Sequence, residues 1–280
     1  MNIGAHVSAA GDVALAPQRA KDIDCECFQF FSRSPQGGKA NPITPEIAQK
    51  FQTNMKKYGQ EACYIHAPYY INFASLNNRI YYGSINVIRD ELERGSLLGV
   101  KSLMFHPGSY KEAGPKKGLE LVCDGLDKVL DGYNGSTELL LEMSAGAGNV
   151  IGDTYEEIDK IINSKKLKKY NLGLCFDTAH AFASGYDLSA PKAVAKTFSE
   201  FDKILGYKKL KLIHANDSKV ELNAKKDRHE HIGQGYIGLI GFKAIVDLAK
   251  KHNIDLILET PDLEGRKKDI KVLKSLRDKK

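Results

Sequence analysis

Leu174-Cys175-Phe176-Asp177 is a short run of apolar, β-type residues that ends in a carboxylate. Five other runs in the chain end in the same way, in His, Asp or Glu. The six closing residues are His66, His106, Glu142, Asp177, His214 and Glu259. Successive closing residues are 40, 36, 35, 37 and 45 positions apart. Such spacings are typical of one strand and one helix, so the repeat predicts βαβ units and a parallel sheet.

Extending the pattern outward gives eight β-type runs with helical periodicity between them. The expected strands are Ile3–Val7, Cys25–Phe31, Ala62–His66, Ser102–His106, Glu138–Glu142, Gly173–Asp177, Leu210–His214 and Asp255–Glu259. The expected helices include Pro45–Tyr58, Tyr82–Leu98, Gly118–Leu130, Tyr155–Asn163, Ala190–Leu205 and Gly241–Lys251. We therefore expect an α/β protein, a single (β/α)8 TIM barrel over residues 1–280, with its active site at the C-terminal ends of the strands. An open doubly wound sheet is the alternative, but no G-x-G-x-x-G follows the first run.

Composition narrows the class of protein. The 280 residues are 42% hydrophobic and 27% charged, which is typical of a globular protein. No apolar run reaches 18 residues and the N-terminus has no secretory pattern, so we expect no membrane partner and a cytoplasmic location. The five cysteines show no C-x-x-C spacing and fit reduced core thiols. The net charge of +6 is compatible with a polyanionic partner.

The closing residues predict a metal centre, because a barrel gathers all of its strand ends in one mouth. Helix caps favour Ser, Thr, Asp and Asn, so capping does not explain His and Glu at these points. Imidazole and carboxylate ligands suit Zn, Mn or Fe. His180, Asp227 and His229 lie just beyond strand ends and raise the set to nine ligands. Nine ligands indicate two or three ions with bridging carboxylates, an arrangement common in phosphate-ester hydrolysis.

Three further histidines receive weaker interpretations. His6 ends the first run and either supports the ligands or packs in the core. His231 competes with His229 as a ligand but ranks lower. His252 precedes Asn253 at an expected helix C-terminus, where a cation suits the helix dipole.

Several long motifs, in order along the chain, resemble the endonuclease IV family of apurinic/apyrimidinic (AP) endonucleases. They are Gly4-Ala5-His6-Val7-Ser8-Ala9-Ala10-Gly11, His66-Ala67-Pro68-Tyr69-Tyr70-Ile71-Asn72, Phe105-His106-Pro107-Gly108, Gly173–His180, His214–Lys219, Asp227-Arg228-His229 and Gly233–Gly238. The resemblance implies a TIM barrel that binds three zinc ions, with Mn²⁺ or Fe²⁺ as substitutes at some sites. It also implies cleavage of duplex DNA on the 5′ side of an abasic site, leaving a 3′-hydroxyl and a 5′-deoxyribose phosphate.

Carried over by position, the resemblance assigns roles to the nine ligands. The first metal would be held by His66, His106 and Glu142. Glu142 would bridge to a second metal, which Asp177, His214 and Glu259 complete. The third would be held by His180, Asp227 and His229. A metal-bridging hydroxide would be the nucleophile, and Glu142 and Glu259 would be the catalytic carboxylates, with Glu259 orienting or deprotonating the hydroxide.

The resemblance also suggests DNA contacts, because an abasic nucleotide must leave the stack to reach such a site. Tyr69 and Tyr70 stand where the family fills the resulting gap, although packing at the barrel rim would also explain them. Gln36 stands where the family often has an arginine, and we leave open whether Arg33 or Lys39 replaces it. Loops at the mouth carry further candidates for phosphate contacts. These include Lys111, Lys116, Lys117, Lys219, Lys225, Lys226 and Arg228.

The conspicuous lysine runs 165–169 and 208–209 precede strands, which places them at the opposite end of the barrel. A metal-dependent sugar isomerase on the same type of barrel is the alternative function. It gives no reason for His180, Asp227 and His229 or for the tyrosine pair. A nucleic-acid-binding barrel without catalysis is disfavoured by the complete ligand set. We expect a monomer.

Overall fold

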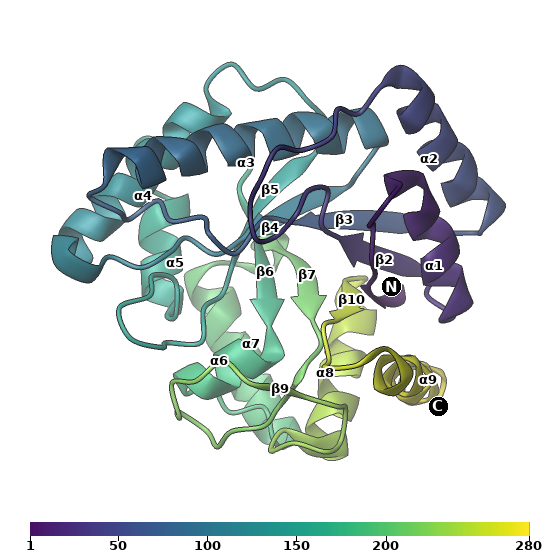
Figure 1. Cartoon of the computed structure of the whole chain (residues 1–280). Helices are drawn as coiled ribbons and strands as arrows, with labels where there is room; N and C mark the ends of the chain where they lie inside the picture. Colours follow the sequence, from purple (N-terminus) through teal and green to yellow (C-terminus); the bar gives the residue numbers. More distant parts are fainter. Residues whose placement is uncertain (280) are drawn as a thin grey trace.

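Eight parallel strands close into a barrel in the computed structural model, which describes residues 1–279 (Figure 1). The order around the barrel is β1-β10-β7-β6-β5-β4-β3-β2, with β1 pairing with both β2 and β10. The barrel strands are β1 (Ile3–His6), β2 (Cys27–Phe30), β3 (Ala62–His66), β4 (Ser102–Phe105), β5 (Glu138–Glu142), β6 (Gly173–Asp177), β7 (Leu210–His214) and β10 (Asp255–Leu258). The predicted closed barrel is confirmed, and each strand lies within two residues of its expected bounds.

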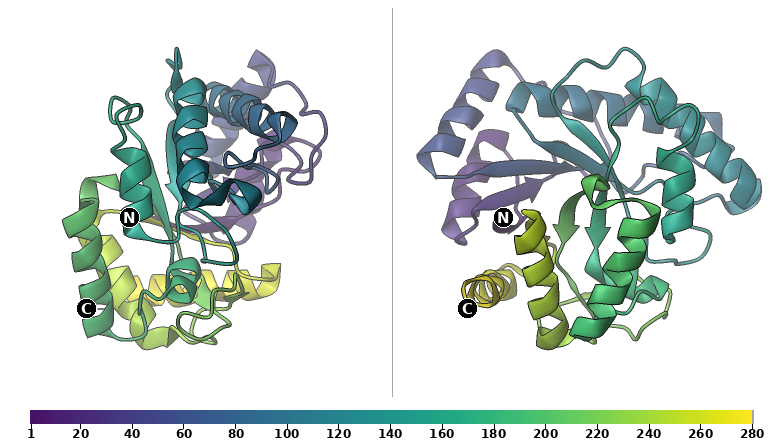
Figure 2. Two further views of the ribbon diagram at one scale, coloured as in Figure 1. Left: turned by 90° about the vertical axis from the view of Figure 1, so that its left-hand side faces the viewer. Right: turned by 180° about the vertical axis from the view of Figure 1, so that it is seen from behind.

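Helices follow the strands and surround the barrel (Figure 2). They are α1 (Ala16–Asp22), α2 (Pro45–Lys57), α3 (Asn78–Leu98), α4 (Gly114–Leu130), α5 (Tyr155–Ile162), α7 (Pro191–Ile204), α8 (Gly238–His252) and α9 (Leu263–Asp278). A shorter helix, α6 (Thr178–Ser184), starts directly at the end of β6. The loop after β7 contains a small antiparallel hairpin of β8 (Asp217–Ser218) and β9 (His229–Glu230).

Local signals explain where several helices begin and end. Helix α2 starts after Thr44, whose side chain accepts the Ile47 amide, and Pro at the first position suits a helix start. Helix α3 begins four residues before the expected Tyr82, because the Asn77 side chain accepts two amides and caps it there. Helix α8 ends at His252, with Asn253 in the left-handed conformation, as the sequence predicts.

The barrel encloses its own apolar layer, separate from the larger core between strands and helices. Seven strands contribute one buried side chain each to this inner layer. These side chains are Cys27, Tyr64, Met104, Leu140, Cys175, Leu212 and Ile257. The eighth strand contributes Gly4, where a Cβ would lie 1.6 Å from the carbonyl oxygen of Cys27. Across the barrel floor, the Tyr64 hydroxyl donates to Asp255 over 2.7 Å.

All five cysteines are free thiols, and four of them are buried. Within residues 1–279, no helix combines the length and apolar character needed to cross a membrane.

The inner layer predicts opposite effects for two glycine substitutions. Gly4→Ala should destabilise the protein by roughly 3 kcal/mol or more, since a backbone carbonyl occupies the space of the new Cβ. Gly83→Ala, in α3 with nothing within 4 Å of the added carbon, should be neutral or stabilising by up to about 1 kcal/mol. Urea unfolding of both variants measures the difference, and equal stabilities would contradict this account of the barrel interior.

Candidate metal centre

The mouth of the barrel is lined by the side chains that follow the inner apolar layer by two residues. Because side chains alternate along a strand, residue i+2 points to the same side as residue i, here one layer nearer the C-terminal end. This rule places eight polar side chains in the mouth. They are His6, Gln29, His66, His106, Glu142, Asp177, His214 and Glu259. The structure thus brings together all six closing residues named from the sequence.

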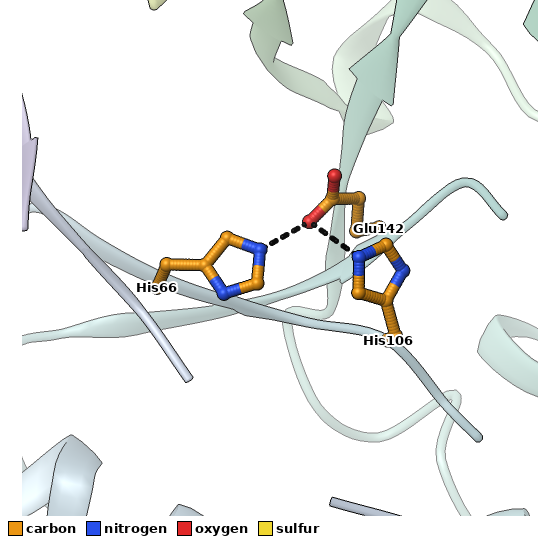
Figure 3. A group of neighbouring side chains, drawn as sticks. All are labelled: His66, His106 and Glu142. Carbon is orange, nitrogen blue, oxygen red and sulfur yellow. Dashed lines mark hydrogen bonds and ion pairs between the residues drawn. The ribbon is translucent and has the colours of Figure 1, made fainter. Parts of the chain in front are cut away.

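The first group of potential ligands is His66, His106 and Glu142, drawn in Figure 3. Both imidazoles point their Nε2 atoms at the same carboxylate oxygen of Glu142. The distances are 2.9 Å from His66 and 3.6 Å from His106. Glu142 is fully buried, and His66 nearly so.

The second group is Glu142, Asp177, His214 and Glu259, whose donor atoms lie within 4.8 Å of one another. The Nδ1 atom of His214 is 2.9 Å from Glu142, 3.2 Å from Glu259 and 3.8 Å from Asp177. Glu142 belongs to both groups through its two oxygens. That geometry suits a carboxylate that bridges two cations.

The third group joins His180 and His229 with Asp177. Asp177 accepts the His180 amide as the N-cap of α6, which fixes the turn that brings this imidazole into the mouth. Asp227, named from the sequence for this site, has an oxygen 3.2 Å from Nε2 of His180 and 3.4 Å from Nε2 of His229. Asp227 is the exposed member of the set, at the outer edge of the centre.

The hydrogen bonds of four histidines leave one ring nitrogen of each facing the carboxylates. His66 donates from Nδ1 to the Ala67 carbonyl and His180 from Nδ1 to the Met143 carbonyl. His214 donates from Nε2 to the Gln29 amide oxygen, and His229 has Nδ1 3.4 Å from the Glu259 carbonyl. Metal-binding histidines are normally oriented in this way by their second nitrogen. The donor set therefore fits divalent cations that accept imidazole and carboxylate ligands.

Charge is strongly coupled across the centre. Burial opposes protonation of His180, but the carboxylates of Asp177 and Asp227 outweigh it and raise its pKa to about 10. Burial opposes ionisation of Glu259, but His214 and His66 outweigh it and lower the pKa of Glu259 to about 2. The carboxylates also raise the pKa of His66 and His214, so protons on His66, His180 and His214 offset the buried negative charge, a role that a bound cation would take over.

Two further mouth residues, Gln29 and His6, contact the candidate ligands, and of these Gln29 was not named from the sequence. The Gln29 amide nitrogen donates to Glu259 over 2.6 Å and lies 3.0 Å from Nδ1 of His6, while its oxygen accepts from His214. Burial lowers the pKa of His6 to about 3, so a neutral imidazole accepts this bond. Of the two interpretations offered for His6, the geometry favours support of the ligands over packing.

Two buried aspartates anchor the segments that carry the ligands. Asp217 accepts five backbone amides, from Ser218 and from the turn between Gly233 and Gly238 that follows β9. Asp269, on α9, accepts from His231, from the Ile232 amide and from the Thr260 hydroxyl. Asp269 therefore joins the loop that contains His229 to the strand end that contains Glu259, and His231 is an anchor of this loop.

The DNA-contact candidates occupy different surroundings. Tyr69 is 68% exposed beside His66, with ring centroids 5.9 Å apart, and Tyr70 is 40% exposed. Gln36 and Lys39 are exposed in the loop after β2. The Arg33 guanidinium, in contrast, is largely buried and pairs with Glu91 and Asp90 of α3, which favours a structural role.

Two cations of the loop after β7 also lie at the surface. The Lys219 ammonium is 3.7 Å from Glu230, and Arg228 is exposed and donates to the carbonyl of Asp227. A cavity of about 330 Å³ lies over the metal centre, and Tyr69 and Arg266 border it. A larger cleft of about 820 Å³, between the loops after β1 and β2, adjoins it at His6.

Comparison with known proteins places these features in a family. The family described as xylose isomerase-like TIM barrels matches residues 17–276. The protein named "Probable endonuclease 4" of Halothermothrix orenii is 37% identical over 278 residues, which cover 99% of both chains. Its namesake from Aquifex aeolicus is 39% identical over 92% of this chain and 91% of its own. The chain belongs to the endonuclease IV family.

Solved structures agree with this assignment. Endonuclease IV from Thermus thermophilus superposes with a TM-score of 0.87 at 30% identity, covering 99% of this chain and 98% of its own. A D-tagatose 3-epimerase-like protein superposes with a TM-score of 0.75 over 99% of this chain and 97% of its own. At 21% identity, that likeness shows the barrel fold alone. The comparison with this epimerase-like protein therefore supports the shared fold and does not extend to the function.

Gln29 yields a prediction about metal affinity. Gln29→Met keeps the volume but removes the bonds that orient His214 and Glu259, so the affinity for Zn²⁺ or Mn²⁺ should fall about 10- to 100-fold. Competition with a chromogenic chelator measures this affinity. Gln36→Met, in the exposed loop, is the matched control and should leave it unchanged. Equal affinities for both variants would refute the orienting role.

His231 yields a prediction about pH. Burial opposes its charge, but Asp269 and Asp262 outweigh this and raise its pKa, so protonated His231 stabilises the fold. This contribution is fully present below the unfolded pKa of about 6.5 and is lost as pH rises through the raised folded-state value. His231→Gln should therefore cost roughly 1–3 kcal/mol at pH 6 and less at pH 9, measured by urea unfolding. A pH-independent difference would contradict it.

Proposed function

We propose that this chain is a DNA-repair endonuclease that hydrolyses the phosphodiester bond 5′ of an AP site in duplex DNA. The products would be a 3′-hydroxyl and a 5′-deoxyribose phosphate. The observation that carries the proposal is the convergence of nine His, Asp and Glu side chains into three adjoining groups that share Glu142 and Asp177. Membership of the endonuclease IV family supports the same activity.

The proposed cofactor is three zinc ions, with Mn²⁺ or Fe²⁺ as substitutes at some sites. The first would be held by His66, His106 and Glu142. The second would be held by Glu142, Asp177, His214 and Glu259, and the third by His180, Asp227 and His229 with Asp177 at its inner side. When bound, zinc would neutralise phosphate oxygens and lower the pKa of a water molecule so that it could act as the nucleophile.

The carboxylates then have separate tasks in the proposed reaction. Glu142 is completely buried and held by three histidines, which suits a fixed bridge. Glu259 is partly exposed and borders the cavity over the centre, so it can reach a water molecule beside the phosphate. The charges of His214 and His66 lower the pKa of Glu259, so this carboxylate is ionised and can orient a water molecule through a hydrogen bond.

Tyr69 and Tyr70 are proposed to fill the gap left by the extruded nucleotide. Tyr69 packs edge-on against Phe31 and stays mostly exposed, so the ring is braced on one side and free on the other. Gln36, Lys39, Lys219 and Arg228 are proposed contacts to the duplex. Arg33 is not proposed as a contact to DNA, because its charge is already paired with Glu91 and Asp90.

We further propose that residues 1–280 form one domain that acts as a monomer. The barrel takes strands from Ile3 to Leu258, and α9 then packs back against β1. The ligands proposed for all three metals come from this one chain.

The proposal predicts metal-dependent incision at a single position. The metal-replete protein should cut a duplex oligonucleotide bearing one abasic analogue immediately 5′ of that analogue, and chelation should abolish the cut. Glu259→Gln should lower the single-turnover rate by roughly 10²- to 10⁴-fold while retaining DNA binding. Gel analysis of labelled products measures both effects.

Glu61→Gln provides the control, because Glu61 is exposed at the opposite end of the barrel. This variant should cut like the unaltered protein. Absence of incision by the metal-replete protein would sink the proposed function, and full activity of Glu259→Gln would remove the role given to that carboxylate.

A further inference from the structure

The positive charge of the chain is concentrated in its last segment. Residues 263–280 contain eight Lys and Arg and three Asp and Glu, a net charge of +5 out of the total of +6. Most of this segment is α9, the helix that follows the strand end carrying Glu259. The helix itself holds six Lys and Arg and three Asp and Glu, a net charge of +3.

Three of the cations on α9 are already engaged in holding the fold. Arg266 donates to the carbonyls of His6 and Thr260. Lys274 pairs with Asp24 and Glu26, and Arg277 pairs with Glu26. These contacts fix α9 to the ends of β1 and β10 and to the segment that precedes β2.

The other three cations of α9 are Lys267, Lys268 and Lys271. Within residues 1–279 none of them makes an ion pair or a side-chain hydrogen bond. Lys268 and Lys271 are exposed and Lys267 is partly exposed. Their spacings of i, i+3 and i+4 put them side by side on the helix surface, where like charges repel unless an anion lies between them. Glu264, one turn earlier, is the acidic neighbour on this surface, and it forms no ion pair with either adjacent lysine in the described part of the chain.

The position of α9 relates this stripe to the metal centre. Its N-terminus comes four residues after Glu259, at the mouth, and the helix runs along the outside of the barrel beside α8 (Figure 1). At 1.5 Å per residue, Lys267 to Lys271 lie about 6–12 Å beyond the helix start. Helical side chains lean toward the N-terminus, so these ammonium groups reach back toward the mouth.

We propose that Lys267, Lys268 and Lys271 form a phosphate-binding stripe that extends the DNA surface from the mouth down the outer wall of the barrel. The inference rests on the proposed function, since it assumes a duplex docked at the mouth. Flexible lysine ammonium groups suit contacts that follow a phosphate backbone without reading sequence. The stripe would engage phosphates away from the cleaved bond and leave the chemistry to the metal centre.

The test compares two triple variants with the same change in charge. Lys267→Gln/Lys268→Gln/Lys271→Gln removes the stripe, and glutamine keeps the helix propensity. Lys56→Gln/Lys168→Gln/Lys208→Gln removes three exposed lysines at the opposite end of the barrel. Equilibrium binding to abasic duplexes of about 10 to 40 base pairs, at ~3.4 Å per pair, is measured over a range of salt concentrations.

The stripe variant should bind the long duplex more weakly, with a slope of log K against log salt that is less steep by about 2.7, or about 0.9 per lost phosphate contact. On the shortest duplex, and in the control variant at every length, binding should match the unaltered protein. Incision of the short duplex should also be unchanged.

Unchanged binding of the long duplex, or an equal loss in both variants, would overturn the stripe. A loss on the shortest duplex as large as on the longest would also overturn it, because the lysines would then act at the mouth itself. Failure of the unaltered protein to cut any abasic duplex is a separate result that counts against the proposed function. The salt slope on undamaged long duplex still reports on the stripe in that case.

Discussion

The alternation of side chains in a closed barrel is the constraint on which the rest of the structure depends. Each strand puts one residue into the inner apolar layer. Because side chains alternate along a strand, the residue two positions later also points inward and faces the mouth. The candidate metal centre is thus the next layer of the same stack, above an inner layer that includes Leu140 and Cys175. A shift of one residue in any strand would turn its ligand toward the helices.

The candidate ligands keep their positions only if the loops that follow the strands are rigid. The structure achieves this with buried polar groups that do not touch the proposed metals. Gln29 joins His214 to Glu259, Asp217 gathers the amides of the turn after β9, and Asp269 ties that turn to the last strand. Each contact is made where water is excluded, so an unmade partner would be costly and the arrangement is strongly specified.

The sequence was sufficient for the strands and for bringing the six closing residues into one mouth, because period-two alternation and the spacing of βα units are local properties. It was insufficient for Gln29. The candidates were residues at the ends of the expected strands, and Gln29 lies inside the expected strand Cys25–Phe31. Counting two residues beyond Cys27 would have found it. The contacts of Asp269 with His231 and of Arg33 with Glu91 join segments that are distant in the sequence. No local sequence pattern predicts such contacts.

Helix α9 is the last element to be synthesised, because it lies at the C-terminal end of the chain. The ligands run from His66 to Glu259, and the residues that lock the last of them, Arg266 and Asp269, come later still. A nascent chain therefore emerges from the ribosome with a ligand set that stays incomplete until nearly its whole length has been translated. Truncated products, which end before α9, lack the clamp on the final strand and loop. A fragment that ends between Glu259 and α9 would contain every proposed ligand but lack the contacts of Arg266 and Asp269.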